Sequence, residues 1–276
     1  MVGRDELEVS MTEAPAAAPG WAGDLGLRGA AVIVTGASSG IGAATATQLG
    51  AAGASVVLVG RREEPLKSQA DLVVQAGGQA LSVPADMAEA DSPARIAAAC
   101  RERFGRIDGV VNNAAVVRHR PLQDWEAGEF DQHVAANVRG PFFLIQAALP
   151  DLVASPIKSV VNISSSSGTL HLSGQSIYGM TKAALNYLTI SLAGELAPSG
   201  VRVNCIGPGP IDTPIHQTWA DDLEEAYRWL ADQVPLGRIG VPAEVARWIT
   251  FLLSPISSFM TGAVIPLDGG QVIHRA

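Results

Sequence analysis

Short runs of apolar, β-branched residues alternate with longer amphipathic stretches from Ala30 onward. The runs are AAVIVTG, ASVVLVG, QALSVPAD, IDGVVNNA, SVVNISS, VRVNCIGPG and AVIPLDGG. Continuous apolar strands separated by helix-length segments are typical of a parallel sheet that is buried on both faces. The pattern therefore predicts one doubly wound α/β domain over residues 30–276, with seven parallel strands and helices on both faces. Ligand sites are expected beyond the carboxyl ends of the strands.

The first 29 residues lack this pattern. They include TEAPAAAPG, are rich in Ala, Pro and Gly, and predict a mostly disordered tail. The chain has no basic segment followed by an apolar run and no stretch of roughly 18 apolar residues, so neither a secretory signal nor a membrane span is expected. A cytoplasmic protein is the resulting prediction.

Composition narrows the possible partners. The formal charge of −8 argues against nonspecific binding to nucleic acid, which requires a basic face. Cys100 and Cys205 are far apart and lack CxxC spacing, so buried thiols are expected in place of a disulfide or a zinc site. The five histidines show no metal-ligand pattern, and no metal is predicted.

A glycine-rich turn, VIVTGASSGIG, follows the first predicted strand. The strand ends at Thr35, and Gly36, Gly40 and Gly42 lead into an alanine-rich helix. Such glycines allow a pyrophosphate to approach the N–H groups at a helix N-terminus. Any strand-to-helix turn can use glycine, but this position in a doubly wound sheet favours a dinucleotide site. The spacing is G-x-x-x-G-x-G, which differs from the general G-x-G-x-x-G fingerprint.

The end of the second predicted strand bears on cofactor choice. A carboxylate that accepts the ribose hydroxyls of NAD is expected there. The sequence instead has Gly60, followed by Arg61 and Arg62. An exposed basic pair balanced by Glu63 and Glu64 is one interpretation. Because the glycine turn is present, we favour the other, in which an arginine binds a 2′-phosphate and NADP(H) is preferred over NAD(H).

Tyr178 and Lys182 lie four positions apart where a helical pattern begins, in SIYGMTK. Positions i and i+4 share a helix face, so the phenol and the ammonium group are expected to point the same way. An isolated pair of this kind is typical of a helix-edge tyrosine with a lysine extending past it. The pair alone therefore does not predict an active site.

Several motifs together resemble the short-chain dehydrogenase/reductase family. They are TGASSGIG, NNAA, NISS thirteen residues before Tyr178, YGMTK and PGPIDTP. The resemblance extends from about Leu27 to Gly270 and implies a Rossmann-fold oxidoreductase with a nicotinamide cofactor. It implies catalytic positions at Asn137, Ser165, Tyr178 and Lys182. The flanking serines 164, 166 and 167 leave the register of Ser165 open.

The same resemblance implies a set of cofactor-binding residues. It assigns phosphate binding to Thr35, Gly36, Ser38, Gly40, Ile41 and Gly42, adenine to Asp86, the adenosine ribose to Asn112 and Ala114, the nicotinamide amide to Ile211 and Thr213, and further cofactor contacts to Met87, Tyr178, Lys182, Pro208 and Gly209. Ala115 stands where glycine is common in the family, which leaves the contour of its loop in question.

The chemistry of carbonyl reduction explains the tyrosine–lysine pair. A phenol with a pKa of about 10 is a weak acid and a poor base near neutrality. At roughly 5 Å and an effective dielectric constant near 20, a lysine would favour tyrosinate by about two pKa units. Tyr178 would then act as general acid or base, while Ser165 binds the substrate oxygen. Family resemblance implies that Asn137 holds a water that links Lys182 to solvent.

The leading hypothesis is an NADP(H)-dependent reductase of a ketone or aldehyde, with a small-molecule substrate and a dimeric or tetrameric assembly. The alternatives are an NAD-dependent alcohol dehydrogenase of the same family, a non-catalytic NADP(H)-binding regulator, and an interaction protein that chiefly builds an oligomer. The complete set of catalytic positions argues against the regulator.

The segment TPIHQTWADDLEEAYRWL is long enough to act as a lid over a substrate. His216 and Trp219 are candidates to touch a ligand, although the helical spacing of Trp219, Leu223, Tyr227 and Leu230 favours packing for most of the lid. The acidic residues Asp221, Asp222, Glu224 and Glu225 predict a solvated face. His171 is equally compatible with the pocket wall and with a turn.

Overall fold

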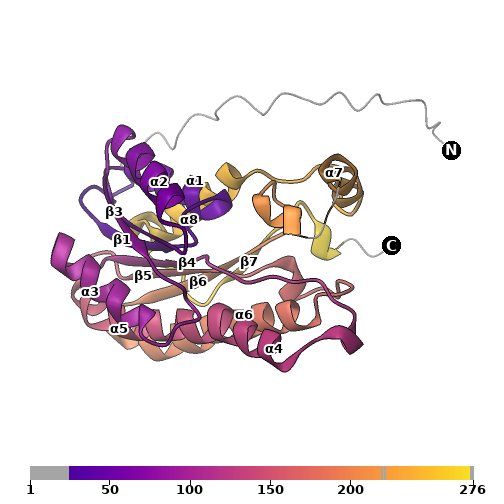
Figure 1. Cartoon of the computed structure of the whole chain (residues 1–276). Coiled ribbons are helices and arrows are strands. Elements are labelled where there is room, and N and C mark those ends of the chain that lie inside the picture. The colour runs from indigo at the N-terminus through magenta and orange to yellow at the C-terminus, as the bar shows by residue number, and fades with distance from the viewer. Residues whose placement is uncertain (1–24, 219, 221, 274–276) are drawn as a thin grey trace.

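The computed structural model describes residues 25–218, 220 and 222–273. It contains a seven-stranded parallel sheet in the order β3-β2-β1-β4-β5-β6-β7, which confirms the predicted fold class (Figure 1). All of the predicted strands are present, and their bounds are β1 Ala31–Thr35, β2 Ser55–Gly60, β3 Gln79–Pro84, β4 Gly109–Asn112, β5 Ser159–Ile163, β6 Arg202–Pro208 and β7 Val264–Leu267.

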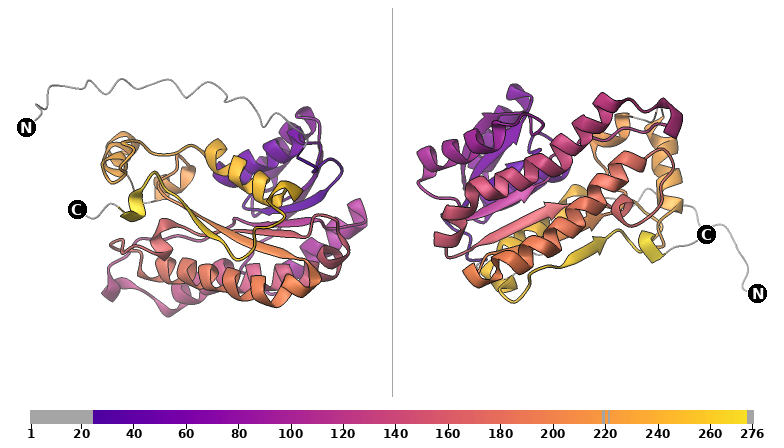
Figure 2. Two further views of the ribbon diagram at one scale, coloured as in Figure 1. Left: turned by 180° about the vertical axis from the view of Figure 1, so that it is seen from behind. Right: turned by 90° about the horizontal axis from the view of Figure 1, so that it is seen from below.

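Helices cover both faces of the sheet, as the views from behind and below also show (Figure 2). The bounds of the helices are α1 Gly40–Ala51, α2 Glu63–Gln75, α3 Ser92–Phe104, α4 Ala127–Val134, α5 Gly140–Ala154, α6 Ser176–Leu196, α7 Leu223–Asp232 and α8 Pro242–Leu253. Helices α1, α2 and α8 contribute to the core on one face of the sheet, and α3, α5 and α6 contribute to the core on the other.

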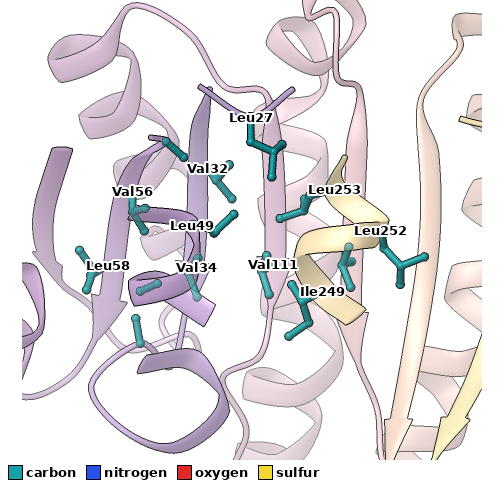
Figure 3. Close-up of a cluster of buried hydrophobic side chains, with 14 of the residues drawn as sticks. Leu27, Val32, Val34, Leu49, Val56, Leu58, Val111, Ile249, Leu252 and Leu253 are labelled. Carbon is teal, nitrogen blue, oxygen red and sulfur yellow. The ribbon is translucent and has the colours of Figure 1, made fainter. Parts of the chain in front are cut away.

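Alternate residues of each central strand enter these two cores. Val32 and Val34 of β1 pack with Leu49 of α1 and Ile249 of α8, as the close-up shows (Figure 3). Ile33, between the two valines, packs on the opposite face. Because both faces of the strand are buried, apolar residues are required at every position. This requirement explains the continuous apolar runs in the sequence.

The order of the strands creates an opening at the carboxyl edge of the sheet. Strand β1 lies between β2 and β4, so the segments that follow β1 and β4 leave the sheet in different directions. Ligands bind at such switch points in open α/β sheets. The Thr35 hydroxyl at the end of β1 accepts hydrogen bonds from the N–H groups of Asn113 and Ala114, at 2.9 and 3.0 Å. These bonds hold the two segments in register at the switch point.

Residues 25–29 belong to the packed domain, whereas the sequence interpretation placed them in the tail. Leu27 is completely buried in the core beneath α1 and α8, and Leu25 packs against the same core. The Leu25 carbonyl oxygen accepts a hydrogen bond from the Ser254 hydroxyl at 2.7 Å. Two leucines are too few to produce a periodic pattern, yet they fill a gap that the sheet and helices leave. The predicted tail over residues 1–24 lies outside the described residues.

The segment after β6 forms a short helical turn, Pro214–Thr218, and helix α7. The side chains of Ala226 and Leu230 are buried, and those of Glu224 and Glu225 are exposed, as the helical pattern predicts. Asp222 caps α7 by accepting hydrogen bonds from the N–H groups of both glutamates. Trp219 and Asp221 lie outside the described residues. Within the described ranges, no helix combines the length and apolar character that a membrane crossing requires.

A protein that begins at Leu25 is expected to keep the melting temperature and turnover of the full chain. A matched protein that begins at Ala30 also loses Leu27 and is expected to melt at a distinctly lower temperature, because removing a buried leucine side chain costs about 3 kcal/mol. Thermal unfolding of the three proteins checks this prediction. A large loss of stability on removal of residues 1–24 alone would contradict it and would show that these residues pack on the fold.

Candidate active site

A cleft with a volume of about 360 Å³ opens at the switch point, beyond the carboxyl ends of β1, β2 and β4. Ten of the eighteen residues that the sequence nominated for the cofactor line its wall. They are Gly36, Ser38, Gly40, Ile41, Arg61, Arg62, Asp86, Met87, Ala114 and Thr213. The wall also includes Ser39, Ala115 and Val116, which the sequence did not single out as contacts.

The glycine turn leaves the N-terminus of α1 open to this cleft. Gly36 has a φ of +67°, and a Cβ there would lie only 2.9 Å from the Cα of Ala114. At Gly42 a Cβ would collide with the carbonyl oxygen of Gly36. Ser39, the residue before α1, makes no side-chain cap to the described helix. The first N–H groups of α1 are therefore available, and they carry the positive end of the helix dipole, which suits an anionic phosphate.

Two exposed arginines lie on the cleft wall just after β2. Arg61 and Arg62 form no ion pair with another described residue, whereas Glu63 and Glu64 pair with Lys67 at 2.9 and 3.3 Å. The glutamates therefore do not neutralise the arginines. This arrangement disfavours the interpretation of a balanced surface pair and leaves two positive charges on the cleft wall.

Several nominated cofactor residues lie behind the cleft wall. Thr35 and Asn112 are buried, and Asn112 donates a hydrogen bond from Nδ2 to Asn162 within the sheet at 2.9 Å. Pro208 is the last residue of β6, Gly209 follows it, and Ile211 lines a separate, smaller cavity. Asn113, which the sequence analysis did not select, donates hydrogen bonds to the carbonyl oxygens of Thr35 and Gly36. Its position next to Asn112 in NNAA was the only sequence signal for this role.

The structure brings the catalytic candidates together on α6 and the end of β5. Tyr178 and Lys182 lie on the buried face of α6, and the Lys182 Nζ is 5.5 Å from the centroid of the Tyr178 ring. The Ser165 side chain acts on the Tyr178 phenol and lowers its pKa. The Ser164 hydroxyl instead donates to the Lys182 carbonyl oxygen at 3.0 Å, so of these two serines it is Ser165 that faces the phenol.

Asn137 joins this cluster to the cleft wall. It lies in a π-helical segment, Ala135–Arg139, between α4 and α5, a type of irregularity that often marks functional sites. Its side-chain amide pairs with both backbone groups of Val116, at 2.8 and 2.9 Å. The same Nδ2 donates to the Thr181 hydroxyl, adjacent to Lys182, at 3.0 Å. The asparagine therefore fixes the position of the cleft wall relative to α6.

Desolvation reverses the predicted direction of the pKa shift of Tyr178. Burial raises the pKa of this phenol to about 12, and the hydrogen bond from Ser165 lowers it by less. Burial also lowers the pKa of Lys182 to about 8, although the nearby Cys205 acts in the opposite direction. The expected preference for tyrosinate is therefore wrong for the protein alone. The sequence-based expectation used a dielectric constant suited to surface groups, whereas both side chains are buried and their charged forms lose hydration.

The residues that the sequence left open are now placed. His216 is buried, its Nε2 is 2.8 Å from the Ile211 carbonyl oxygen, and its ring packs edge-on against Tyr227. His171 is exposed on the loop between β5 and α6. Ala115 fits without backbone strain, because Lys158 is the only described non-glycine residue with a positive φ. Both cysteines are buried and unpaired with each other, as predicted.

Comparison with known proteins agrees with this geometry. The family model described as enoyl-(acyl carrier protein) reductase matches residues 36–271. A tropinone reductase homologue of Arabidopsis thaliana is 35% identical over 254 residues, covering 90% of this chain and 94% of the relative. The chain belongs to the short-chain dehydrogenase/reductase family. The chain is also similar to the 3-oxoacyl-[acyl-carrier-protein] reductase of Aquifex aeolicus. The two proteins are 34% identical, and the match covers 90% of this chain and 99% of the relative.

Solved structures share the fold of this short-chain dehydrogenase/reductase. A putative short-chain alcohol dehydrogenase from Sinorhizobium meliloti superposes with a TM-score of 0.86 and 31% identity, covering 92% of this chain and all of the other. A short-chain type dehydrogenase/reductase from Mycobacterium marinum gives a TM-score of 0.84 at 33% identity, covering 91% and 98% of the two chains. The protein is an oxidoreductase that acts on CH–OH or C=O groups, and its family uses a nicotinamide cofactor.

Replacement of Lys182 by methionine is expected to abolish turnover and to stabilise the fold. A shift of the Lys182 pKa from 10.5 to about 8 means that the charged form destabilises the fold below pH 8, by roughly 3 kcal/mol. Losing the hydrogen bond to the Ile163 carbonyl oxygen costs only about 1 kcal/mol. The sign follows from linkage: the folded pKa lies below the unfolded value, so the destabilisation fades as the pH rises between these values.

Melting temperatures of wild type and Lys182→Met at a series of pH values test this prediction. The variant should melt at a higher temperature at pH 7, and the difference should narrow above about pH 8. Lys67→Met, at a half-exposed lysine of α2, is the matched control and should change the melting temperature little. A Lys182→Met protein that is less stable at pH 7 would contradict the assigned desolvation.

Proposed function

We propose that the protein is an NADP(H)-dependent reductase of ketones or aldehydes, able to catalyse the reverse alcohol oxidation, with Tyr178 as general acid and base. The observation that carries the proposal is the buried Tyr178 phenol, whose pKa the neighbouring Ser165 lowers and which lies near Lys182 at the cleft edge of the sheet. Burying an ammonium group costs free energy, so a tyrosine that only packs would not require this neighbour.

The proposed roles follow from the properties of each group. A bound nicotinamide supplies the hydride. Because its pKa is about 12, Tyr178 stays protonated near neutrality and can donate its proton to the substrate oxygen. The Ser165 hydroxyl binds the same oxygen as negative charge develops on it. Lys182, in its charged form, stabilises the tyrosinate that remains. In the direction of oxidation, the tyrosinate accepts the alcohol proton.

The cleft residues provide a consistent cofactor site. In this proposal the pyrophosphate lies against the glycine turn and the N-terminus of α1. Arg61 is the preferred partner of the 2′-phosphate, with Arg62 and Ser38 assisting. The remaining assignments are Asp86 and Met87 for adenine, Asn112 and Ala114 for the adenosine ribose, and Pro208, Gly209, Ile211 and Thr213 for the nicotinamide end. Thr35, being buried, would act by holding the turn in place.

Free small carbonyl compounds are the proposed substrates. Relatives named as a tropinone reductase homologue and a 3-oxoacyl-[acyl-carrier-protein] reductase support a ketone. The exposed Asp222, Glu224 and Glu225 at the start of α7 disfavour docking of an acidic carrier protein beside the cleft. We further propose a cytoplasmic homodimer or homotetramer, which light scattering and cell fractionation would test.

A substrate panel tests the proposed reaction. Tropinone, ethyl acetoacetate and cyclohexanone would each be incubated with NADPH or NADH, and turnover followed by nicotinamide absorbance. We expect at least one ketone to be reduced. Tight cofactor binding without turnover of any panel member or its alcohol would overturn the proposal in favour of a non-catalytic NADP(H)-binding protein.

Tyr178→Phe is expected to lower kcat by about 10²- to 10⁴-fold while leaving cofactor affinity nearly unchanged, because phenylalanine retains the packing but cannot exchange a proton. Tyr187→Phe, at an exposed tyrosine on the same helix, is the control and should keep full turnover. Steady-state kinetics and fluorescence titration with NADPH measure the two effects. Wild-type turnover by a folded Tyr178→Phe protein would rule out the assigned role.

Cofactor preference is expected to follow the residues after β2. A charge-assisted contact from Arg61 is worth roughly 1.5 to 3 kcal/mol, so NADPH should exceed NADH in kcat/KM by about one to two powers of ten. Gly60→Asp combined with Arg61→Ile should narrow or reverse this ratio, because a carboxylate binds ribose hydroxyls and repels phosphate. A Cβ at Gly60 would lie 3.4 Å from Leu66 and 3.6 Å from the Ser38 hydroxyl, so the fold accommodates the aspartate.

Steady-state kinetics with NADPH and with NADH test the predicted cofactor preference. Arg103→Ile, at an exposed arginine of α3, serves as the control for loss of a surface charge and should leave the ratio unchanged. A wild-type enzyme that prefers NADH would contradict the assignment of Arg61 and Arg62 to the 2′-phosphate.

A further inference from the structure

Side-chain contacts join helix α7 to the point where the chain leaves β6. The Tyr227 hydroxyl donates a hydrogen bond to the Asp212 Oδ1 at 2.6 Å. Burial, followed by the hydrogen bond and the charge of Asp212, raises the pKa of Tyr227 to about 12, so the phenol remains a donor near neutrality. The His216 ring packs edge-on against Tyr227, and its Nε2 is 2.8 Å from the Ile211 carbonyl oxygen. These contacts hold α7 against residues 211 and 212.

Few other contacts attach α7 to the domain. The helix stands apart from the helices that cover the faces of the sheet (Figure 1). Ala226 and Leu230 are its buried residues, and its main neighbour among the described helices and strands is the turn Pro214–Thr218. A helix of 10 residues is not stable in water by itself. We therefore expect α7 to unfold when it leaves this turn.

The residues that follow Asp212 form part of the cofactor cleft. Thr213, Pro214 and Ile215, which we call the lid root, line its wall. A Cβ built on Gly40 would lie only 3.0 Å from the Thr213 Cγ2, so the threonine rests directly on the glycine turn. Gly40 is the first residue of α1, and the N-terminus of this helix is the proposed pyrophosphate site. The lid root therefore lies over the entrance to that site.

The cleft stops short of the catalytic cluster. None of the four catalytic positions, all of which are described, lines its wall. A cofactor that occupies the cleft and brings its nicotinamide to Tyr178 therefore requires part of the wall to move. Hydrogen bonds of Thr35 and Asn137 fix the wall after β4 to β1 and to α6. The lid root is the part of the wall whose position depends on α7.

We propose that Tyr227 is a positioning residue whose hydrogen bond to Asp212 holds the lid root over the cleft, so that this bond governs how fast the cofactor enters and leaves. The inference rests on the proposed cofactor site. Neither Tyr227 nor Asp212 lines the cleft, so the bond is the same with and without cofactor. Such a bond sets the populations of the open and closed lid. It therefore changes both rates by one factor and leaves the equilibrium affinity unchanged.

Stopped-flow fluorescence of NADPH binding to Tyr227→Phe tests the proposal. Phenylalanine keeps the ring against His216 but cannot donate. We expect the association and dissociation rate constants both to rise about threefold to tenfold, the range for net loss of one hydrogen bond, with Kd unchanged. Tyr187→Phe, the same change at an exposed tyrosine of α6, is the control and should alter neither rate constant. Unchanged rate constants in Tyr227→Phe, or faster dissociation with a matching loss of affinity, overturn the proposal.

Changes at Asp212 test the partner of the phenol. Asp212→Ala should raise both rate constants to the same extent as Tyr227→Phe. Asp212→Asn keeps an oxygen that accepts a hydrogen bond and should stay near the wild-type values. The double variant Tyr227→Phe with Asp212→Ala should be no faster than either single variant, because both changes remove one bond. Increases that multiply would show that the two residues act independently and would overturn the proposed route.

Hydrogen exchange followed by mass spectrometry tests the hydrogen bond without any cofactor. We expect the amides of α7 to exchange about threefold to tenfold faster in Tyr227→Phe than in the wild type, whereas the amides of α5 keep their rates. Equal exchange of α7 in the two proteins would overturn the proposal. Failure of the wild type to bind NADPH would instead contradict the proposed function and leave the exchange result standing, so the two failures are distinguishable.

Discussion

The link between the carboxyl ends of β1 and β4 is the constraint on which the site depends. The two strands are neighbours in the sheet, but the chain leaves them in different directions, and the Thr35 hydroxyl joins them by accepting two backbone N–H groups. Gly36 then passes so close to Ala114 that a side chain cannot fit between them. The open N-terminus of α1 and the loop that carries His119 both start from this junction.

Burial governs the electrostatics of the catalytic cluster. Tyr178 and Lys182 are both removed from water, which raises the pKa of the phenol to about 12 and lowers the pKa of the amine to about 8. Each shift disfavours the charged form of its group. Any tyrosinate formed in a reaction therefore depends on further interactions with the substrate, the cofactor and Ser165. Burial of the charged lysine lowers the free energy of unfolding, and this is an example of a loss of stability at a functional site.

Much of the architecture could be predicted because it is encoded in local pattern. The strands are buried on both faces, and their apolar runs identified all seven of them. Tyr178 and Lys182 share a helix face because of their spacing alone. Other contacts could not be predicted this way. His119 lies on the loop after β4, whereas its partner Gln175 lies on the loop between β5 and α6, and the histidine appears in the sequence only as part of a short basic cluster, RHR.

The sequence by itself determined the seven strands of a doubly wound domain, the glycine turn, the arginines after β2 and the tyrosine–lysine pair, because each depends on residues that are close along the chain. Tertiary structure decided which serine faces Tyr178, that Glu63 and Glu64 pair with Lys67, and that Leu27 belongs to the core. It also decided the direction of the pKa shifts. These properties depend on burial and on partners distant in sequence, and the free energy of a charge or a hydrogen bond is set by that environment.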